Sequence, residues 1–153
     1  MQKKNKKIYI TSNVSIDYFL FLCKVLQDLG YEVKPIYLIS ETTYRLSSKR
    51  LNLKNLYLRI QMYIFYPIYI LFLGLISCKS SIFIVSSNTF FAPFLMNIIS
   101  KFKGNKIIHM LYDLYPDAIE ASGLINPNSF VSKTIGKITS YSLKKCSGTV
   151  FLG

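Results

Sequence analysis

Two carboxylates and a tyrosine lie at the end of one predicted strand of this chain. Residues 106–112 read as a buried strand that ends at Tyr112, and Asp113 and Asp117 follow it. A carboxylate in that place can hold a ligand hydroxyl by hydrogen bonds or remove its proton. The alternative is local, because Asp113 could cap the next turn and Asp117 could interact favourably with the dipole of a helix that begins there.

Polar residues also follow two other predicted strands. Thr11, Ser12 and Asn13 come directly after the first strand, and Ser87 follows the third. Ligands of parallel α/β sheets bind outside the carboxyl ends of the strands, so these side chains could contact phosphate or sugar hydroxyls. The same residue types are common in turns and helix caps. No glycine-rich phosphate loop follows the first strand, so a dinucleotide site is not expected.

An alternation of strands and helices must position these residues. Strands are predicted at residues 7–10, 31–40, 81–86, 106–112 and 149–152, with helical patterns between them. This alternation is typical of βαβ units, which imply parallel strands joined by right-handed crossovers. A chain of 153 residues can bury one core. We therefore predict a single α/β domain over residues 1–153, with a doubly wound parallel sheet.

The single histidine and the cysteines favour structural roles. His109 lies inside a predicted strand and not at its end, so we interpret it as a core or sheet-face histidine. Cys23, Cys78 and Cys146 are far apart, and no CxxC or Cys/His cluster is present. No metal site is therefore predicted. The cysteines read as small core residues in a reducing, cytoplasmic compartment.

The charge of the chain favours a partner that carries phosphate. The formal net charge is +12, and no acidic residue occurs between Glu41 and Asp113. Nucleic acid, lipid head groups and phosphorylated substrates all suit such a balance. The sequence has no helix-turn-helix pattern, zinc spacing or aromatic RNA-binding signature, so nucleic acid is not the expected partner.

An apolar segment without charges, residues 60–78, has three possible interpretations. It just reaches the length of a membrane span. It could instead be a helix packed on the sheet, with one face among anionic lipid head groups, or a fully buried core helix. A span would place the strands before and after it on opposite sides of the membrane, where they could not share a sheet. We therefore expect a helix at about residues 55–78 that lies at the inner face of the cell membrane.

An ordered string of motifs in the last third of the chain resembles a known family. The string consists of Asp113-Leu-Tyr-Pro-Asp117, then Gly123-Leu124, then a basic helical segment at 129–146 and a strand that begins at Gly148. In order, spacing and type it is similar to the N-terminal domain of the family-4-like glycosyltransferases of the GT-B fold. The resemblance covers residues 106–153, and the strand 81–86 fits the same scheme.

The resemblance implies a fold, a reaction and a set of roles. The fold would be Rossmann-like, the N-terminal half of a GT-B enzyme that binds the acceptor. The reaction would transfer a sugar from a nucleotide-sugar to a saccharide or lipid-linked acceptor in the synthesis of cell-envelope polysaccharide. Asp113 would be the catalytic residue. The acceptor-binding residues would be Thr11, Ser12, Asn13, Ser87, Tyr112 and Asp117.

The family continues beyond these motifs into a second domain, which binds the nucleotide-sugar donor. The given sequence ends at Gly153, so we expect the donor-binding domain to come from the rest of a broken gene or from a separate subunit. The chain would then hold no cofactor and transfer no sugar by itself. A different hypothesis is a non-catalytic subunit, which anchors a separate donor-binding glycosyltransferase subunit to the membrane.

Overall fold

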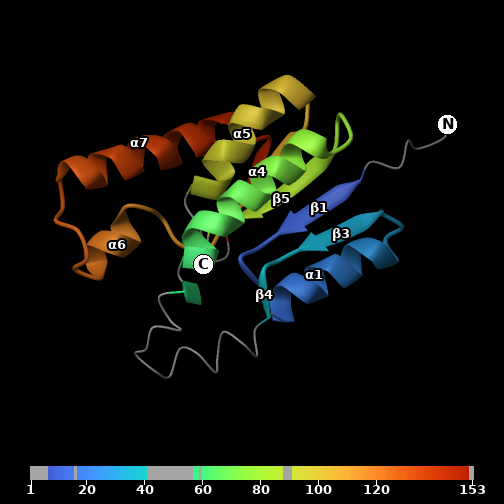
Figure 1. Cartoon of the computed structure of the whole chain (residues 1–153), viewed down its shortest axis with the longest axis horizontal. Coiled ribbons are helices and arrows are strands. Elements are labelled where there is room, and N and C mark those ends of the chain that lie inside the picture. The colour runs from blue at the N-terminus through green and yellow to red at the C-terminus, as the bar shows by residue number, and fades with distance from the viewer. Residues whose placement is uncertain (1–6, 16, 41–56, 59, 88–90, 152–153) are drawn as a thin grey trace.

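The computed structural model describes residues 7–15, 17–40, 57–58, 60–87 and 91–151 (Figure 1). A parallel sheet of five strands forms its centre, in the spatial order β3-β1-β5-β6-β7. These strands are β1 (Ile8–Thr11), β3 (Val33–Ile36), β5 (Ile82–Ser86), β6 (Lys106–Leu111) and β7 (Gly148–Phe151). The prediction of an α/β fold with a parallel sheet is confirmed.

The strand order contains one reversal of direction. From β1 the chain passes through α1 (Asp17–Asp28) to β3 on one side, and then returns to place β5 on the other side of β1. Such a topological switch point is where open α/β sheets bind their ligands. It lies here between the carboxyl ends of β1 and β5.

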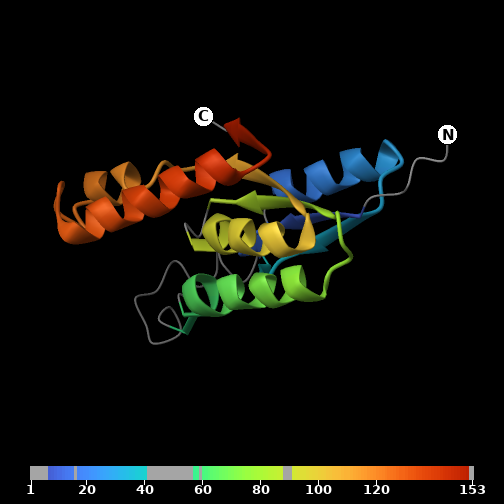
Figure 2. The ribbon, with the colours of Figure 1, turned by 90° about the horizontal axis from the view of Figure 1, so that it is seen from above.

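The two faces of the sheet are covered by different helices. Ile8 and Ile10 pack with Phe19 and Cys23 of α1. The alternate residues of the strands, such as Phe83, form the larger cluster with α4 (Tyr66–Ile76) and α5 (Phe91–Lys103). Figure 2 shows α1 on one side of the sheet and α4 and α5 on the other. This alternation follows from the two-residue period of a strand, and the helices flank the sheet as a doubly wound fold requires.

Local signals mark the helix ends as the residue types predict. Gly30, at φ +85°, ends α1: its amide donates to Gln27 O at 2.8 Å and the Tyr31 amide donates to Leu26 O at 3.1 Å. This is the Schellman pattern, which favours glycine at the left-handed position. Ser129 caps α7 (Phe130–Lys145), because its hydroxyl accepts from the Ser132 amide at 3.2 Å.

The predicted strand at 31–40 is divided in two. β3 ends at Ile36, and a separate β4 (Ile39–Ser40) pairs with β2 (Val14–Ser15) in a small second sheet. The Ser12 amide donates to Ile36 O at 3.0 Å, and the Ile39 amide donates to Asn13 O at 3.2 Å. The chain therefore passes from one sheet to the other just beyond the carboxyl ends of β1 and β3.

The apolar segment forms a helix that packs on the sheet. It begins as a π-helical turn, η1 (Gln61–Phe65), which the sequence did not predict, and continues as α4. Part of the predicted range, residues 55, 56 and 59, lies outside the described residues. Its inner face approaches α5 closely at Gly74, where an added Cβ would lie 3.1 Å from Met96.

Strands from both sides of the apolar segment belong to one sheet. β1 and β5 pair directly, with Ile8 opposite Ile82 and Thr11 opposite Val85. This pairing is the arrangement from which we argued against a membrane span. Among the described residues, no helix combines the length and the apolar character that crossing a membrane requires.

Candidate functional site

The first predicted group, Thr11, Ser12 and Asn13, lies at the switch point and is almost completely buried. Their exposed fractions are 0%, 0% and 1%. Thr11 is the last residue of β1, and the backbone of Ser12 and Asn13 joins the two sheets. The hydroxyls of Thr11 and Ser12 have no hydrogen-bond partner among the described residues. Polar side chains of this kind are expensive to bury, by about 1–3 kcal/mol each.

Thr11 belongs to a small hydroxyl cluster, which we define as Thr11, Tyr66 and Ser86. Tyr66 comes from α4 and Ser86 from the end of β5, and all three residues are fully buried. Burial raises the pKa of the Tyr66 phenol well above its ordinary value, although the nearby hydroxyls of Thr11 and Ser86 oppose the shift. None of the three oxygens makes a hydrogen bond of normal geometry within the described chain. The cluster is therefore neutral and retains unused donors and acceptors.

Ser87 connects the end of β5 to the end of β6. Its amide donates to Met110 O at 2.8 Å. Its hydroxyl oxygen accepts from the amide of Tyr112 at 2.8 Å and from the amide of Asp113 at 3.3 Å. Two backbone donors thus occupy the acceptor positions of this oxygen, and its own proton is left for donation. Ser87 holds the backbone from which the Asp113 side chain projects.

Asp113 is exposed and lies beside two tyrosines. The pKa of the Tyr115 phenol is raised to about 12, chiefly by burial, then by the negative charge of Asp113, with a smaller contribution from Tyr63. Tyr115 is only partly buried, whereas Asp113 is open to solvent. Tyr63, which adds to the shift, belongs to η1.

Tyr112 points toward the face of the sheet that α1 covers. It is partly buried, and burial raises the pKa of its phenol, with Tyr18 of α1 adding to the shift. Its hydroxyl oxygen is buried without a hydrogen-bond partner in the described part of the chain. Tyr112 and Tyr115 therefore lie on different sides of Asp113.

Asp117 is exposed and occupies the first position of a short helix, α6 (Asp117–Ala121). The peptide bond between Tyr115 and Pro116, just before this helix, is cis, which the sequence did not predict. The Ser132 hydroxyl of α7 donates to the Glu120 carboxylate and joins the two helices. This position in the first turn is the one expected if Asp117 interacts with the helix dipole, which was the alternative to a ligand role.

His109 is a buried residue of β6 and does not reach the carboxyl edge. Only 3% of it is exposed, and its register partner Val85 faces the helix layer of α4 and α5. Neither ring nitrogen has a hydrogen-bond partner among the described residues. Burial lowers the pKa of His109 to about 4, so the ring is neutral at neutral pH. The interpretation of a core histidine agrees with this position.

Two residues of this edge were not predicted as site residues, Tyr66 and Tyr115. A signal for Tyr66 does exist, because Tyr66, Ile70 and Gly74 recur every fourth residue and form the buried stripe of α4. Tyr115 is only two residues after Asp113, and no signal in the sequence predicted that its phenol would be partly buried there.

Comparisons of the chain with protein-family models, with curated proteins and with solved structures found no match. The class of protein is therefore defined by the fold and by this edge alone. It is a doubly wound α/β domain with buried hydroxyls at the carboxyl ends of β1 and β5 and the exposed carboxylate of Asp113 at the carboxyl end of β6.

Proposed function

We propose that residues 1–153 form the acceptor-binding side of a glycosyltransferase, which acts on a saccharide or lipid-linked acceptor in cell-envelope polysaccharide synthesis. The observation that carries the proposal is the position of Asp113, an exposed carboxylate at the end of β6 whose backbone is held by Ser87. The position supports a ligand role because open α/β sheets bind ligands at this edge. The motif resemblance over residues 106–153 supports the choice of reaction.

In the proposed reaction, an acceptor hydroxyl attacks the anomeric carbon of a nucleotide-sugar. The new bond joins the acceptor oxygen to that carbon, and the bond from the carbon to the nucleotide phosphate breaks. Asp113 orients the acceptor hydroxyl and accepts its proton. The donor is bound by a second domain or subunit, which carries the leaving nucleotide.

An exposed carboxylate suits a sugar acceptor, because a sugar presents hydroxyls that donate hydrogen bonds. Asp113 is open to solvent and can accept such a bond. The hydroxyls of Thr11, Tyr66 and Ser86 are fully buried, so they are not proposed as direct contacts of the acceptor.

The test is complementation of a strain of the source organism from which the gene has been deleted. Lipid-extractable saccharide intermediates are measured by mass spectrometry. The wild-type chain restores the intermediates, and Asp113→Asn lowers their rate of formation about 100-fold or more, as expected for loss of a general base. Asp28→Asn, which removes an exposed carboxylate at the far end of α1, is the matched control and restores them fully.

Two results would contradict the proposal. One is a deletion strain whose lipid-linked saccharides are unchanged. The other is full restoration by both Asp113→Asn and Asp113→Ala. The second result would favour the non-catalytic alternative, a subunit that recruits a donor-binding glycosyltransferase to the membrane. That alternative is motivated by the exposed apolar side chains of α4.

A further inference from the structure

The outward side of the helix formed by η1 and α4 is apolar and exposed. Its large side chains there, the outer stripe, are Ile64, Phe65, Ile68, Phe72, Leu75 and Ile76, with exposed fractions between 45% and 62%. Their spacing of three or four residues, with two adjacent pairs, places them along one side of the helix. Figure 2 shows α4 as the outermost described element on its side of the sheet.

The outer stripe is not needed for the core of the domain. The opposite side of the helix already fills the contact with the central sheet and α5, through Tyr66, Ile70 and Gly74, and Met62 packs with Val14 and Ile39 of the small second sheet. Water-exposed side chains such as Ile68 and Phe72, at 57% and 59%, therefore form a contiguous apolar patch on the surface. Such patches mark sites of contact with a protein or a membrane.

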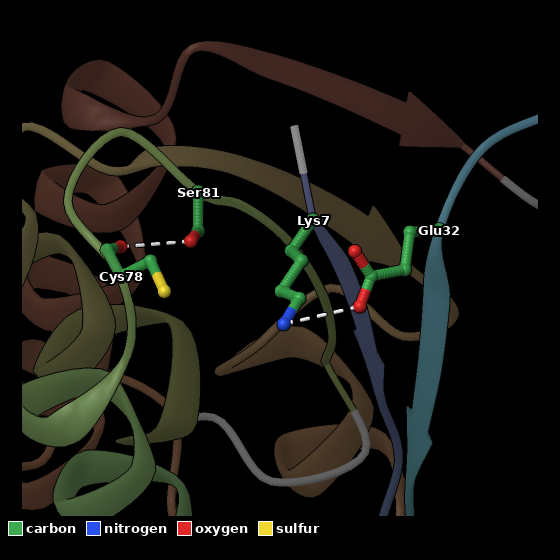
Figure 3. A network of polar contacts seen from close by, with 4 residues as sticks. All are labelled: Lys7, Glu32, Cys78 and Ser81. Carbon is green, nitrogen blue, oxygen red and sulfur yellow. Dashed lines mark hydrogen bonds and ion pairs between the residues drawn. The ribbon is translucent and has the colours of Figure 1, made fainter. Parts of the chain in front are cut away.

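Positive charges surround the carboxyl-terminal end of α4. Lys79 is exposed three residues after the helix. Lys34 of the edge strand β3 lines a groove of about 410 Å³, together with Tyr69 and Ile76 of α4. Glu32, which precedes β3, is paired with Lys7 at 3.1 Å (Figure 3).

We propose that the outer stripe inserts into the head-group region of an anionic membrane, with Lys34 and Lys79 against lipid phosphates. Apolar side chains beside lysines, with Tyr63 and Tyr69 next to them on the helix, are the composition of an interfacial helix. A second copy of the chain fits less well, because it carries the same formal net charge of +12 and the two copies would repel each other. Anionic lipid supplies the complementary charge.

The stripe adjoins the candidate acceptor site, and this step rests on the proposed function. Tyr66, one residue after η1, lies with Thr11 and Ser86 at the ends of β1 and β5, and Ser87, the next residue, accepts from the Asp113 amide at 3.3 Å. An acceptor whose lipid chain stays in the bilayer could therefore present its sugar to Asp113 near the membrane surface. The π-helical turn η1 forms this connection between the stripe and the edge of the sheet.

The experiment is flotation of the purified full chain with vesicles of phosphatidylcholine, alone or mixed with phosphatidylglycerol. We expect binding to the mixed vesicles and little binding to phosphatidylcholine alone. The double variant Ile68→Gln/Phe72→Gln should weaken binding at least about tenfold, because two inserted apolar side chains are lost. Lys34→Gln and Lys79→Gln should each weaken binding to the anionic vesicles about fivefold.

A matched control removes two exposed apolar residues elsewhere. Leu124→Gln/Phe130→Gln changes side chains that are 79% and 84% exposed, and it should bind vesicles like the wild type. Thermal unfolding of each variant confirms that the fold is kept. Asp113→Asn should also bind normally, so a failure of the catalytic proposal is seen separately from a failure of this one.

Three outcomes overturn the inference. The first is wild-type binding by the stripe variant. The second is equal binding to neutral and anionic vesicles. The third is a dimer in solution, measured by analytical ultracentrifugation without lipid, that the stripe substitutions dissociate. The last outcome would assign the patch to a second copy of the chain.

Discussion

The two edges of the sheet treat their buried polar groups in opposite ways. At the amino edge, Asn105 accepts a hydrogen bond from the Ser81 amide at 3.1 Å and donates to the Ser77 hydroxyl at 3.3 Å. The Ser81 hydroxyl donates to Cys78 O at 2.8 Å (Figure 3). These side chains saturate one another and hold the start of β5 against the end of α4. This edge is built for stability.

At the carboxyl edge Ser87 accepts two backbone hydrogen bonds, but four other buried hydroxyls make none of normal geometry in the described chain. The hydroxyls of Thr11, Ser12, Tyr66 and Ser86 all lack a hydrogen bond of normal geometry. Most buried polar groups in proteins are satisfied, so a concentration of exceptions needs a reason. Five of the nine buried side-chain atoms without such a bond in the described chain lie at the carboxyl edge, and the other four belong to Asn97, His109 and Thr139. A ligand site at the carboxyl edge would account for the group of five.

The largest effect on stability is expected at the amino edge. Asn105→Ala removes both the acceptor of the Ser81 amide and the donor to Ser77, and Asn105 is only 7% exposed. We expect a loss of about 2–3 kcal/mol in the free energy of unfolding, measured by urea denaturation. A loss below about 0.5 kcal/mol would mean that the amino edge does not depend on these contacts.

The next effect is a dependence of stability on pH that comes from His109. Its pKa is about 4 in the folded protein and near 6.5 when unfolded, so the unfolded chain binds the proton more tightly. Stability therefore falls as pH decreases from about 6.5 toward 4, and levels off below that range. Between pH 7 and pH 5 the loss should be about 2 kcal/mol.

The control for this pH effect is His109→Gln, which cannot take up the proton. Urea unfolding at pH 7 and at pH 5 is compared for the two proteins, so that contributions of other groups cancel. An identical pH dependence in both proteins would show that burial of the ring is not the cause.

A smaller effect, of unusual sign, is expected at the hydroxyl cluster. Tyr66→Phe deletes a buried hydroxyl that makes no hydrogen bond of normal geometry, and it keeps the ring that packs in the core. The free energy of unfolding should stay within about 1 kcal/mol of wild type or rise. A large loss of stability would instead reveal a structural partner for the phenol.

The smallest effect is expected from the ion pair at the amino edge. Lys7→Met removes the contact with Glu32, and both side chains are partly exposed. Exposed ion pairs contribute little and are screened by salt. Urea denaturation at low salt and at 1 M salt, a condition in which charges are strongly screened, should give nearly the same midpoint for the variant and the wild type. A clear difference at low salt that disappears at high salt would assign this pair a larger role.

Much of the fold was predictable because its signals are local. The apolar strands were predicted and found, and the glycine at residue 30 and the cap at Ser129 likewise act within a few residues. The parallel arrangement followed from the alternation of elements. The division of the strand at 31–40 was missed, because it depends on Ser12 and Asn13, which are distant in sequence.

The candidate site was predictable in part. Residues that end strands could be named, because a strand end is a local property. The role of Ser87 could not be predicted, because its hydroxyl accepts hydrogen bonds from the amides of Tyr112 and Asp113, which follow a different strand. The participation of Tyr66 was hidden as well, since a tyrosine in an apolar segment can face the core, the membrane surface or solvent.

The sequence by itself determined which segments are strands and helices, where polar residues follow strands, and that residues 60–78 carry no charge. These properties depend on side-chain type and on spacing over a few residues. Only the tertiary structure decided that β1 and β5 lie side by side, which hydroxyls meet at their ends, and which side of α4 stays uncovered. Those outcomes depend on contacts between segments far apart in the chain, and a linear pattern does not specify such contacts.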